Sequence, residues 1–400
     1  MNSVALCLAD PLWRVAMSKG NVLVIGNSGV GKSTLINSVL GEECAVTGYG
    51  TTGTTQELSI YENDSVPFRL IDTVGFEPSF RKASKAVRSV KKWSRESALD
   101  GHEESRISVI WCCVEGTSRK LFPDTIKTMA KAISMWPSVP VIAVITKSYS
   151  VPERRENIMM VHEAFSSYKK MSGRVRRIIP VVAMTYRLND EASAPPEGIT
   201  DLIEATNDLL PEGIRASSHD ISKYKLSRKR AFAHSAVGLA ATGAAVVGAV
   251  PIPFPDAVIL TPLEVSEINT ISRIYGIDRS DKLVKFVDSI VEVGTVSTVA
   301  RAAVNALKSI PGINAAASAV NAVIAGSIVA AIGESSIFAF EQISSGDRSI
   351  ADLEWVKSLT ESNLSGQFIS KVTDAVRSLN GQQDPGKIAE TVIKLFTKYI

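Results

Sequence analysis

Cysteine is scarce in this sequence, which has four in 400 residues. Cys7, Cys44, Cys112 and Cys113 show none of the C-x-x-C spacing that structural zinc sites use, and the adjacent pair lies inside an apolar run. The sequence therefore argues against a zinc site. The four thiols are expected to be reduced, as in a cytoplasmic protein.

An excess of one charge is also missing. The chain has 44 Lys and Arg against 41 Asp and Glu, so composition alone gives no electrostatic reason to expect nucleic acid as the main partner. A secretory signal is not expected either, since Asp10 and Arg14 stand among the apolar residues of 1–20. We therefore expect a cytoplasmic protein for which nucleic acid is the less favoured partner.

The length and a change in composition predict two domains. A domain typically uses about 100–200 residues, and 400 residues are enough for two or three. After a polar stretch at 216–222 the sequence becomes rich in alanine, glycine, valine and isoleucine, with sparse charge. We predict a first domain at 1–215 and an all-α, Ala/Gly-rich helical domain at 216–400.

A strand, a glycine-rich loop and a helix are predicted in succession near the start. The apolar run at 21–25 leads directly into Gly26-Asn-Ser-Gly-Val-Gly-Lys32-Ser33, which has G-x-x-x-x-G-K-S spacing. The N–H groups of such a loop can surround phosphate oxygens, Lys32 can reach the β- and γ-phosphates, and the helix N-terminus adds partial positive charge. The predicted nucleotide-binding residues here are Gly26, Asn27, Ser28, Gly29, Val30, Gly31, Lys32, Ser33 and Thr34. The helix is predicted to end at Gly41.

Two later elements suit a magnesium nucleotide. Asp72 ends an apolar strand and would hold Mg²⁺ through water, and three positions on, the amide of Gly75 would sense the γ-phosphate. Gly53-Thr-Thr55-Gln-Glu57 lies in a polar loop between the glycine-rich loop and Asp72. Ser33 would supply a hydroxyl to the same ion.

In this order, G-x-x-x-x-G-K-S, G-T-T-x-E and D-T-x-G resemble the Era and TrmE group of GTPases, over about Val22 to Pro211. The resemblance implies GTP and GDP as ligands and Mg²⁺ as cofactor. It implies Thr55 as the switch I ligand of Mg²⁺, with Thr54 as the alternative, beside Ser33 and Asp72. Lys32, Thr55 and Gly75 are then the predicted catalytic residues. Six apolar strands alternating with helices, the last of them at 179–182, predict an α/β P-loop G domain with a six-stranded, mostly parallel sheet.

Base recognition departs from the family pattern. Thr146-Lys147-Ser-Tyr149 resembles the family's [N/T]-K-x-D element, but a tyrosine replaces the aspartate that accepts two hydrogen bonds from guanine. Thr146 and Lys147 remain predicted nucleotide-binding residues, and Glu153 is a substitute carboxylate to consider. Ala183 is the predicted backbone contact to the guanine oxygen.

The residue after D-x-x-G also departs from Ras-type enzymes, which place a water-orienting glutamine there. Phe76 stands there and cannot orient water by hydrogen bonding. We therefore expect slow GTP hydrolysis, accelerated by dimerisation through the G domain, by a partner or by a cation. Turnover per monomer that falls on dilution would support the homodimer.

The second half contains two long uncharged segments, at 231–255 and 309–333. Either they insert in a membrane, which requires about 20 apolar residues to span, or their small residues pack in a bundle core. Basic residues at 223–230 favour contact with the inner face of a membrane. Gly248-Ala-Val-Pro-Ile-Pro-Phe-Pro-Asp256 with Ile274-Tyr-Gly276 resembles the uncharacterised YcjF-type helical domain of bacteria.

The expected function is a nucleotide-controlled switch whose helical domain contacts a membrane or a partner. The first alternative is an RNA- or ribosome-associated assembly GTPase, suggested by the motifs and by a basic stretch at 81–95. The second is a structural membrane protein that only binds nucleotide.

Two apolar stripes are expected to be core: Leu283, Phe286, Val287, Ile290 and Val291, and Leu364, Phe368, Val372, Val376 and Leu379.

Overall fold

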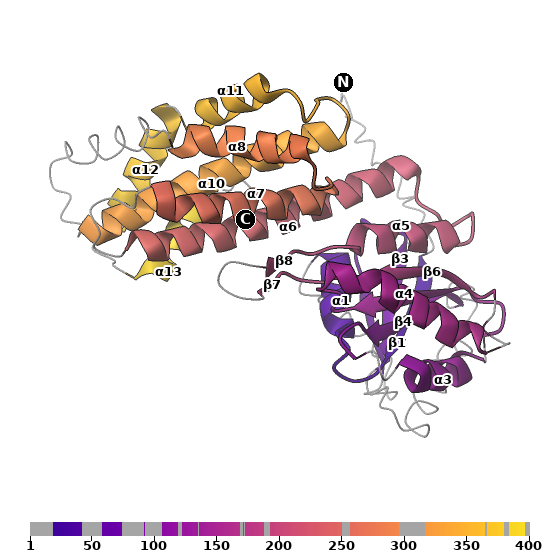
Figure 1. Cartoon of the computed structure of the whole chain (residues 1–400). Helices are drawn as coiled ribbons and strands as arrows, with labels where there is room; N and C mark the ends of the chain where they lie inside the picture. The colour runs from indigo at the N-terminus through magenta and orange to yellow at the C-terminus, as the bar shows by residue number, and fades with distance from the viewer. Residues whose placement is uncertain are drawn as a thin grey trace, which may run out of the picture. The chain divides into compact units, whose positions relative to one another are not determined.

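The computed structural model describes residues 19–41, 58–73, 92, 106–118, 122–134, 136–168, 171, 173–187, 193–249, 257–295, 317–364, 366–379 and 384–396. The contacts divide the chain into two compact units (Figure 1). The first unit is residues 1–180 with 201–224, and the second is 181–200 with 225–400. The boundary at 215 stays a prediction, because compactness does not show where a segment folds independently.

The first unit is built on a six-stranded sheet in the order β2-β3-β1-β4-β5-β6. Only the β2–β3 pair is antiparallel, since β3 and β4 both run parallel to β1, β4 parallel to β5 and β5 parallel to β6. This confirms the predicted α/β fold with a mostly parallel sheet. The strands are β1 Gly20–Gly26, β2 Leu58–Glu62, β3 Phe68–Thr73, β4 Ile107–Glu115, β5 Val141–Thr146 and β6 Val175–Pro180.

Helices pack on both faces of this sheet. Side chains alternate along β4, so Cys112 contributes to the core shared with α3 (Phe122–Ile133) and α4 (Val151–Ser166), while Trp111 faces the other side. There the indole N–H of Trp111 donates to the hydroxyl of Thr206 in α5 (Ile199–Leu209), at 3.1 Å. Because the centre of the sheet is covered on both sides, the central strands β1, β4 and β5 are nearly continuous apolar runs.

The predicted last strand, at 179–182, differs from the observed one. Strand β6 ends at Pro180, and Val182 forms an isolated bridge with Glu197 instead. Val181 and Val182 are fully buried, so their apolar character reflects packing outside the sheet. A short hairpin of β7 (Tyr186–Arg187) and β8 (Ser193–Ala194) follows in the second unit.

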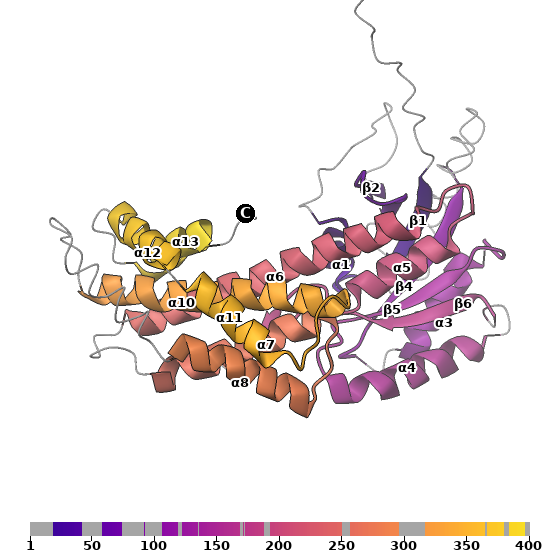
Figure 2. The same cartoon turned by 90° about the horizontal axis from the view of Figure 1, so that it is seen from above.

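The other elements described in the second unit are helices, as predicted (Figures 1 and 2). In Figure 2 the long helices α6 and α10 run side by side, and α10 packs on α7 and α13. Every residue of the two predicted apolar stripes is buried, which confirms both stripes. The helices are α6 Ser218–Gly248, α7 Ala257–Tyr275, α8 Asp281–Thr295, α10 Ala317–Ser344, α11 Leu353–Asn363, α12 Gly366–Ser378 and α13 Pro385–Phe396.

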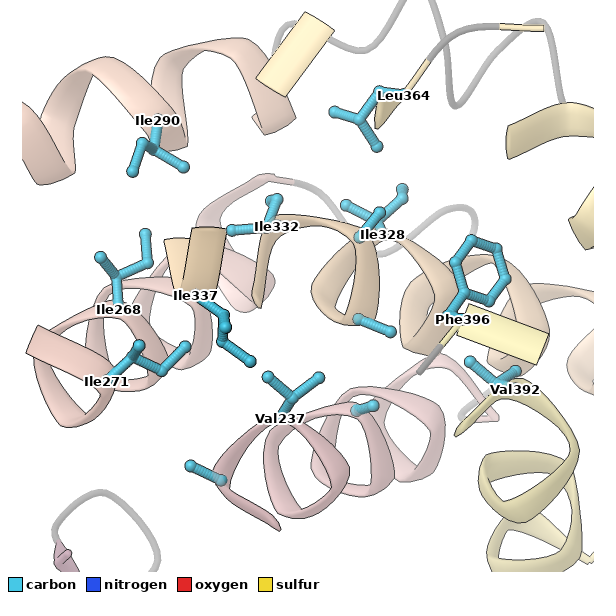
Figure 3. Close-up of a cluster of buried hydrophobic side chains, with 14 of the residues drawn as sticks. Val237, Ile268, Ile271, Ile290, Ile328, Ile332, Ile337, Leu364, Val392 and Phe396 are labelled. Atoms are coloured by element: carbon cyan, nitrogen blue, oxygen red, sulfur yellow. The ribbon is translucent and has the colours of Figure 1, made fainter. Parts of the chain in front are cut away.

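Two of the described helices are long and apolar enough to cross a membrane, at 218–248 and 318–344. The apolar window of α10 is 89% buried, as in the core of a helical bundle, whereas that of α6 is 39% buried. Figure 3 shows why α10 is so enclosed: Ile328, Ile332 and Ile337 project from it among side chains of the surrounding helices. Length and composition alone are weak evidence for a membrane span.

Candidate nucleotide-binding site

The phosphate loop lies between β1 and α1 (Lys32–Leu40), as predicted. Gly29 and Gly31 have φ angles of 76° and 97°, in the left-handed region that glycine adopts without strain. A Cβ atom on Gly26 would lie 2.7 Å from the carbonyl oxygen of Cys113, so only glycine fits between the strands. The three glycines are therefore required by backbone geometry as well as by the predicted approach of a phosphate.

The side chain of Lys32 folds back over this loop. Its Nζ donates to the carbonyl oxygens of Gly26 (3.1 Å) and Asn27 (3.3 Å), and the residue is 9% exposed. Asn27 in turn donates to the hydroxyl of Thr125 in α3, at 3.2 Å. An ammonium group held over the loop is placed to meet an anion that enters it.

The backbone carbonyl groups at the C-terminal end of α1 accept hydrogen bonds. Gly41, at φ 89°, donates its N–H to the carbonyl of Asn37, as the predicted helix end requires. Asn63 donates to the carbonyl of Leu40 (2.8 Å), and the Tyr224 hydroxyl lies 2.7 Å from Val39 O and 3.0 Å from Leu40 O. These bonds fix the helix whose first turn carries Ser33 and Thr34, both exposed.

Oxygen donors suited to Mg²⁺ stand at the same end of the sheet. Asp72 is near the end of β3, is 6% exposed, and pairs in register with Val24 of β1, two residues before the loop begins at Gly26. A carboxylate and a hydroxyl are the hard ligands that Mg²⁺ prefers. Asp72 and Ser33 therefore fit the predicted ion, whereas Thr55 and Gly75 lie outside the described residues.

The predicted base-recognition element is joined directly to the phosphate loop. The hydroxyl of Thr146, at the end of β5, donates to the carbonyl of Val30 (2.7 Å) and lies 3.0 Å from that of Val114. The Nζ of Lys147 donates to the carbonyl of Gly29 at 2.9 Å. Lys147 has φ 52°, which is uncommon for a residue with a side chain. The last residue of β5 and the residue after it thus both hydrogen-bond to the phosphate loop.

The residues considered for base contact differ in position. Tyr149 occupies the family's aspartate position, is half-buried, and donates its N–H to the carbonyl of Lys147 (2.9 Å). Glu153 is exposed in the first turn of α4. Ala183 is half-buried and follows β6 in the segment assigned to the second unit. The structure therefore brings Thr146 and Lys147 together with the phosphate loop, and Ala183 stays a prediction.

Glu115 is a site residue that the sequence analysis did not predict. Its Oε1 accepts from Lys147 Nζ (2.9 Å) and from the Thr117 hydroxyl (2.7 Å) at the end of β4. Burial would raise the pKa of this carboxyl, but the hydrogen bonds from Thr117 and Lys147 lower it below the ordinary value. An acidic residue that ends an apolar strand beside the P-loop strand was the signal available in the sequence.

Cys113 lies beneath the phosphate site and is chemically inert. Burial raises its pKa to about 12, opposed by the charge of Lys32 and assisted by that of Asp72. Burial also raises the pKa of Cys112 far above its ordinary value. Both are free thiols, as expected for reduced cysteines, and neither is ionised to act as a nucleophile.

Comparison with known proteins agrees with this geometry. Residues 21–147 match a family model described as "50S ribosome-binding GTPase". GTPase Der of Neisseria meningitidis serogroup B is 39% identical over 90 residues, covering 22% of this chain and 17% of Der. GTPase Era of Lactobacillus helveticus is 28% identical over 195 residues, covering 48% of this chain and 55% of Era. The chain thus spans about half of Era and a small part of Der.

Solved structures with GTPase domains also align with the chain. Era in complex with MgGDPNP and a segment of 16S ribosomal RNA aligns with a TM-score of 0.29 and 18% identity, over 54% of this chain and 68% of Era. The LeoA bacterial dynamin GTPase from ETEC aligns with a TM-score of 0.30 and 10% identity, over 94% of this chain and 90% of LeoA. Because both scores are low, the assignment rests on the family model and the sequence relatives. Residues 21–147 form a GTP-binding, Era-like P-loop GTPase domain.

Proposed function

We propose that this protein binds and slowly hydrolyses GTP with Mg²⁺, as a nucleotide-controlled switch whose helical unit contacts a membrane or a partner. The observation that carries the proposal is the joined phosphate and base site. Lys32 lies over the carbonyls of Gly26 and Asn27, and Thr146 and Lys147 bond to Val30 and Gly29 of the same loop. A nucleotide that contacts both elements would meet a single preformed support.

In this proposal Lys32 and the loop N–H groups hold the phosphates and stabilise the charge that develops on the transferring phosphoryl group. Ser33 and Asp72 would hold Mg²⁺, which neutralises phosphate charge when bound. Thr55 and the Gly75 amide are proposed as the groups that respond to the γ-phosphate. Phe76 in place of a water-orienting glutamine supports slow hydrolysis.

The helical unit is proposed as the output of the switch. Helix α6 begins in the first unit, where Tyr224 bonds to the end of α1, and continues into the second unit. Its apolar window is less than half buried, and basic residues at 223–230 precede that window. These features support contact with an anionic membrane surface from the cytoplasmic side. A homodimer through the G domain is proposed as one activator.

The test is GTP turnover measured across protein concentration, with and without anionic lipid vesicles. The proposal predicts slow turnover that rises with concentration or with vesicles, and no turnover in Lys32→Ala. Vesicle binding that is stronger with a non-hydrolysable GTP analogue than with GDP would support the coupling. Equal vesicle binding in both nucleotide states, with turnover unaffected by vesicles, would contradict it.

A ribosome-associated role is the second candidate. It is favoured by the description of the family model, "50S ribosome-binding GTPase", which covers the phosphate site of this chain. Nucleic acid should therefore not rank below a membrane among the partners to be tested. Co-sedimentation with ribosomal subunits that depends on GTP and weakens with salt, without vesicle binding, would favour this candidate.

A structural membrane protein that only binds nucleotide is the third candidate, supported by the two long apolar helices. It predicts that Lys32→Ala loses nucleotide binding while cellular function is unchanged. The switch predicts that function is lost together with binding.

A further inference from the structure

Two glutamates are buried inside the helical unit. Glu264 and Glu267 lie in α7 and are only 1% and 3% exposed. In Figure 3 their neighbour Ile268 points, with Ile271, into the core that Val237 of α6 and Ile332 of α10 also enter. Carboxyl groups are almost never fully buried unless they are paired, so this position needs an explanation.

Neither glutamate is paired in the part of the chain that the structure describes. Both carboxyl oxygens of Glu267 and the Oε2 of Glu264 are buried without a hydrogen-bond partner. The described residues also hold no group of three or more His, Cys, Asp or Glu side chains that could bind a metal. Among the described residues, neither an ion pair nor a metal-binding cluster accounts for the burial.

Glu267 is pressed against the backbone of α10. A Cβ atom built on Gly333 would lie 2.3 Å from the Glu267 Oε1 and 2.5 Å from the Val237 Cγ2. The carboxyl group thus occupies the space that a glycine leaves open between two helices. This contact joins α7 and α10 at one point in the bundle.

The charged groups around Glu267 oppose its ionisation. Glu264 lies on the same helix and Glu334 on α10, and both act on Glu267. From α6, His234 faces Glu334, with its Nδ1 2.8 Å from the Glu334 Oε1, and Arg230 is bonded to Glu341. Lys285 and Asp288 of α8 are exposed. Burial, then Glu264 and Glu334, raise the pKa of Glu267 well above its ordinary value.

We propose that Glu264 and Glu267 form a proton-dependent latch that holds α7 against α10 while both carboxyl groups are neutral. Ionisation places negative charge beside Glu334, where the described residues donate no hydrogen bond to either carboxyl oxygen of Glu267. Separation of α7 from α10 relieves this cost by admitting water to the carboxylates. The closed and separated arrangements therefore exchange with proton release.

Both glutamates hold their protons more tightly in the closed arrangement. Burial raises the pKa of Glu264 from 4.5 to about 7, and the pKa of Glu267 is raised further by the two neighbouring carboxyl groups. Between the open-state pKa and the closed-state pKa, each group shifts the opening equilibrium by about tenfold per pH unit. Separation of α7 would uncover α10, whose apolar window is 89% buried when the bundle is closed.

The test is hydrogen exchange of the full chain from pH 6 to pH 8.5, corrected for intrinsic exchange rates and read on α7 and α10. The expected result is that protection of both helices falls by more than tenfold over this range. In Glu264→Gln with Glu267→Gln, protection should be nearly constant with pH. Glu361→Gln, which removes an exposed carboxylate at the end of α11, should behave as the wild type.

Constant protection of α7 and α10 in the wild type would overturn the proposal. The same holds if the double variant keeps the full pH dependence. If the double variant does not fold, Glu264→Gln alone decides, because it should remove the part of the dependence that lies below about pH 7. The helices of the first unit serve as an internal reference, since both glutamates belong to the second unit.

Discussion

The Nζ of Lys147 lies 2.9 Å from the carbonyl oxygen of Gly29, although 118 positions separate the two residues. The same ammonium group is 2.9 Å from the Glu115 Oε1. One side chain thus connects the end of β5, the end of β4 and the phosphate loop. The geometry of the loop depends on strands at a distance as well as on its own glycines.

Lys147→Ala should weaken GDP binding by about 5- to 30-fold, corresponding to about 1–2 kcal/mol, because it removes a charge-assisted bond to the loop. The expected loss is modest because Lys147 and Glu115 are about 30% exposed, so solvent screens their charges. Titration calorimetry checks it. Lys131→Ala, an exposed lysine near the end of α3, is the matched control and should bind as the wild type does.

Thr146→Val should lower the stability of the first unit by about 1–2 kcal/mol, since the carbonyl of Val30 loses its buried hydroxyl donor. For a unit of this size that is a fall in Tm of about 2–8 °C. Thr128→Val is the matched control, because its hydroxyl bonds only to Asp124 O in its own helix at an exposed position. Thermal unfolding that affects both variants equally would argue against the bracing role of Thr146.

Glu264→Gln should reduce the pH dependence of the stability of the helical unit. Burial raises the pKa of Glu264 in the folded state from its ordinary value of 4.5 to about 7, so the folded state holds the proton more tightly. Stability is therefore greatest below about pH 4.5 and falls as pH rises toward 7, by about 1.4 kcal/mol per unit. Urea unfolding at a series of pH values measures the slope. An identical slope in wild type and variant would contradict the raised pKa of the buried Glu264 carboxyl.

Gly333→Ala should destabilise the helical unit by about 1–3 kcal/mol, because the added methyl meets Val237 and Glu267 at 2.5 Å or less. Gly243→Ala tests the same substitution where there is space. Its Cβ would lie 3.7 Å from the nearest atom, a Leu263 methyl, so the gain in helix propensity should stabilise by about 0.5–1 kcal/mol. Circular dichroism melts should move in opposite directions. Equal shifts would show that the close contact at Gly333 is absent.

Local signals in the sequence predicted most of the first unit. The spacing of Gly26, Gly31 and Lys32 specified the turn, and Gly41 marked the end of α1, because both features depend on neighbouring residues. The last strand was placed wrongly because Val181 and Val182 are buried outside the sheet. The spacing of apolar residues does not distinguish burial within a sheet from burial beside it.

Pairings between distant residues could not be predicted in the same way. Glu115 and Lys147 meet only because β4 and β5 are neighbours in register. In the sequence Glu267 looks like any charged helix residue, and its burial depends on the space at Gly333, 66 positions later. The apolar stripes at 283–291 and 364–379 were recognisable because their apolar residues recur at helical spacing over a short stretch of sequence.

The joined site is proposed to bind guanine nucleotide through Lys32. This proposal is tested by displacement of a fluorescent GDP analogue by unlabelled GDP and ADP in the presence of Mg²⁺, in wild type, Lys32→Ala and Lys131→Ala. We expect GDP to displace the probe at concentrations at least about tenfold below ADP, and only Lys32→Ala to fail to bind. Equal displacement by ADP, or full binding by Lys32→Ala, would contradict it.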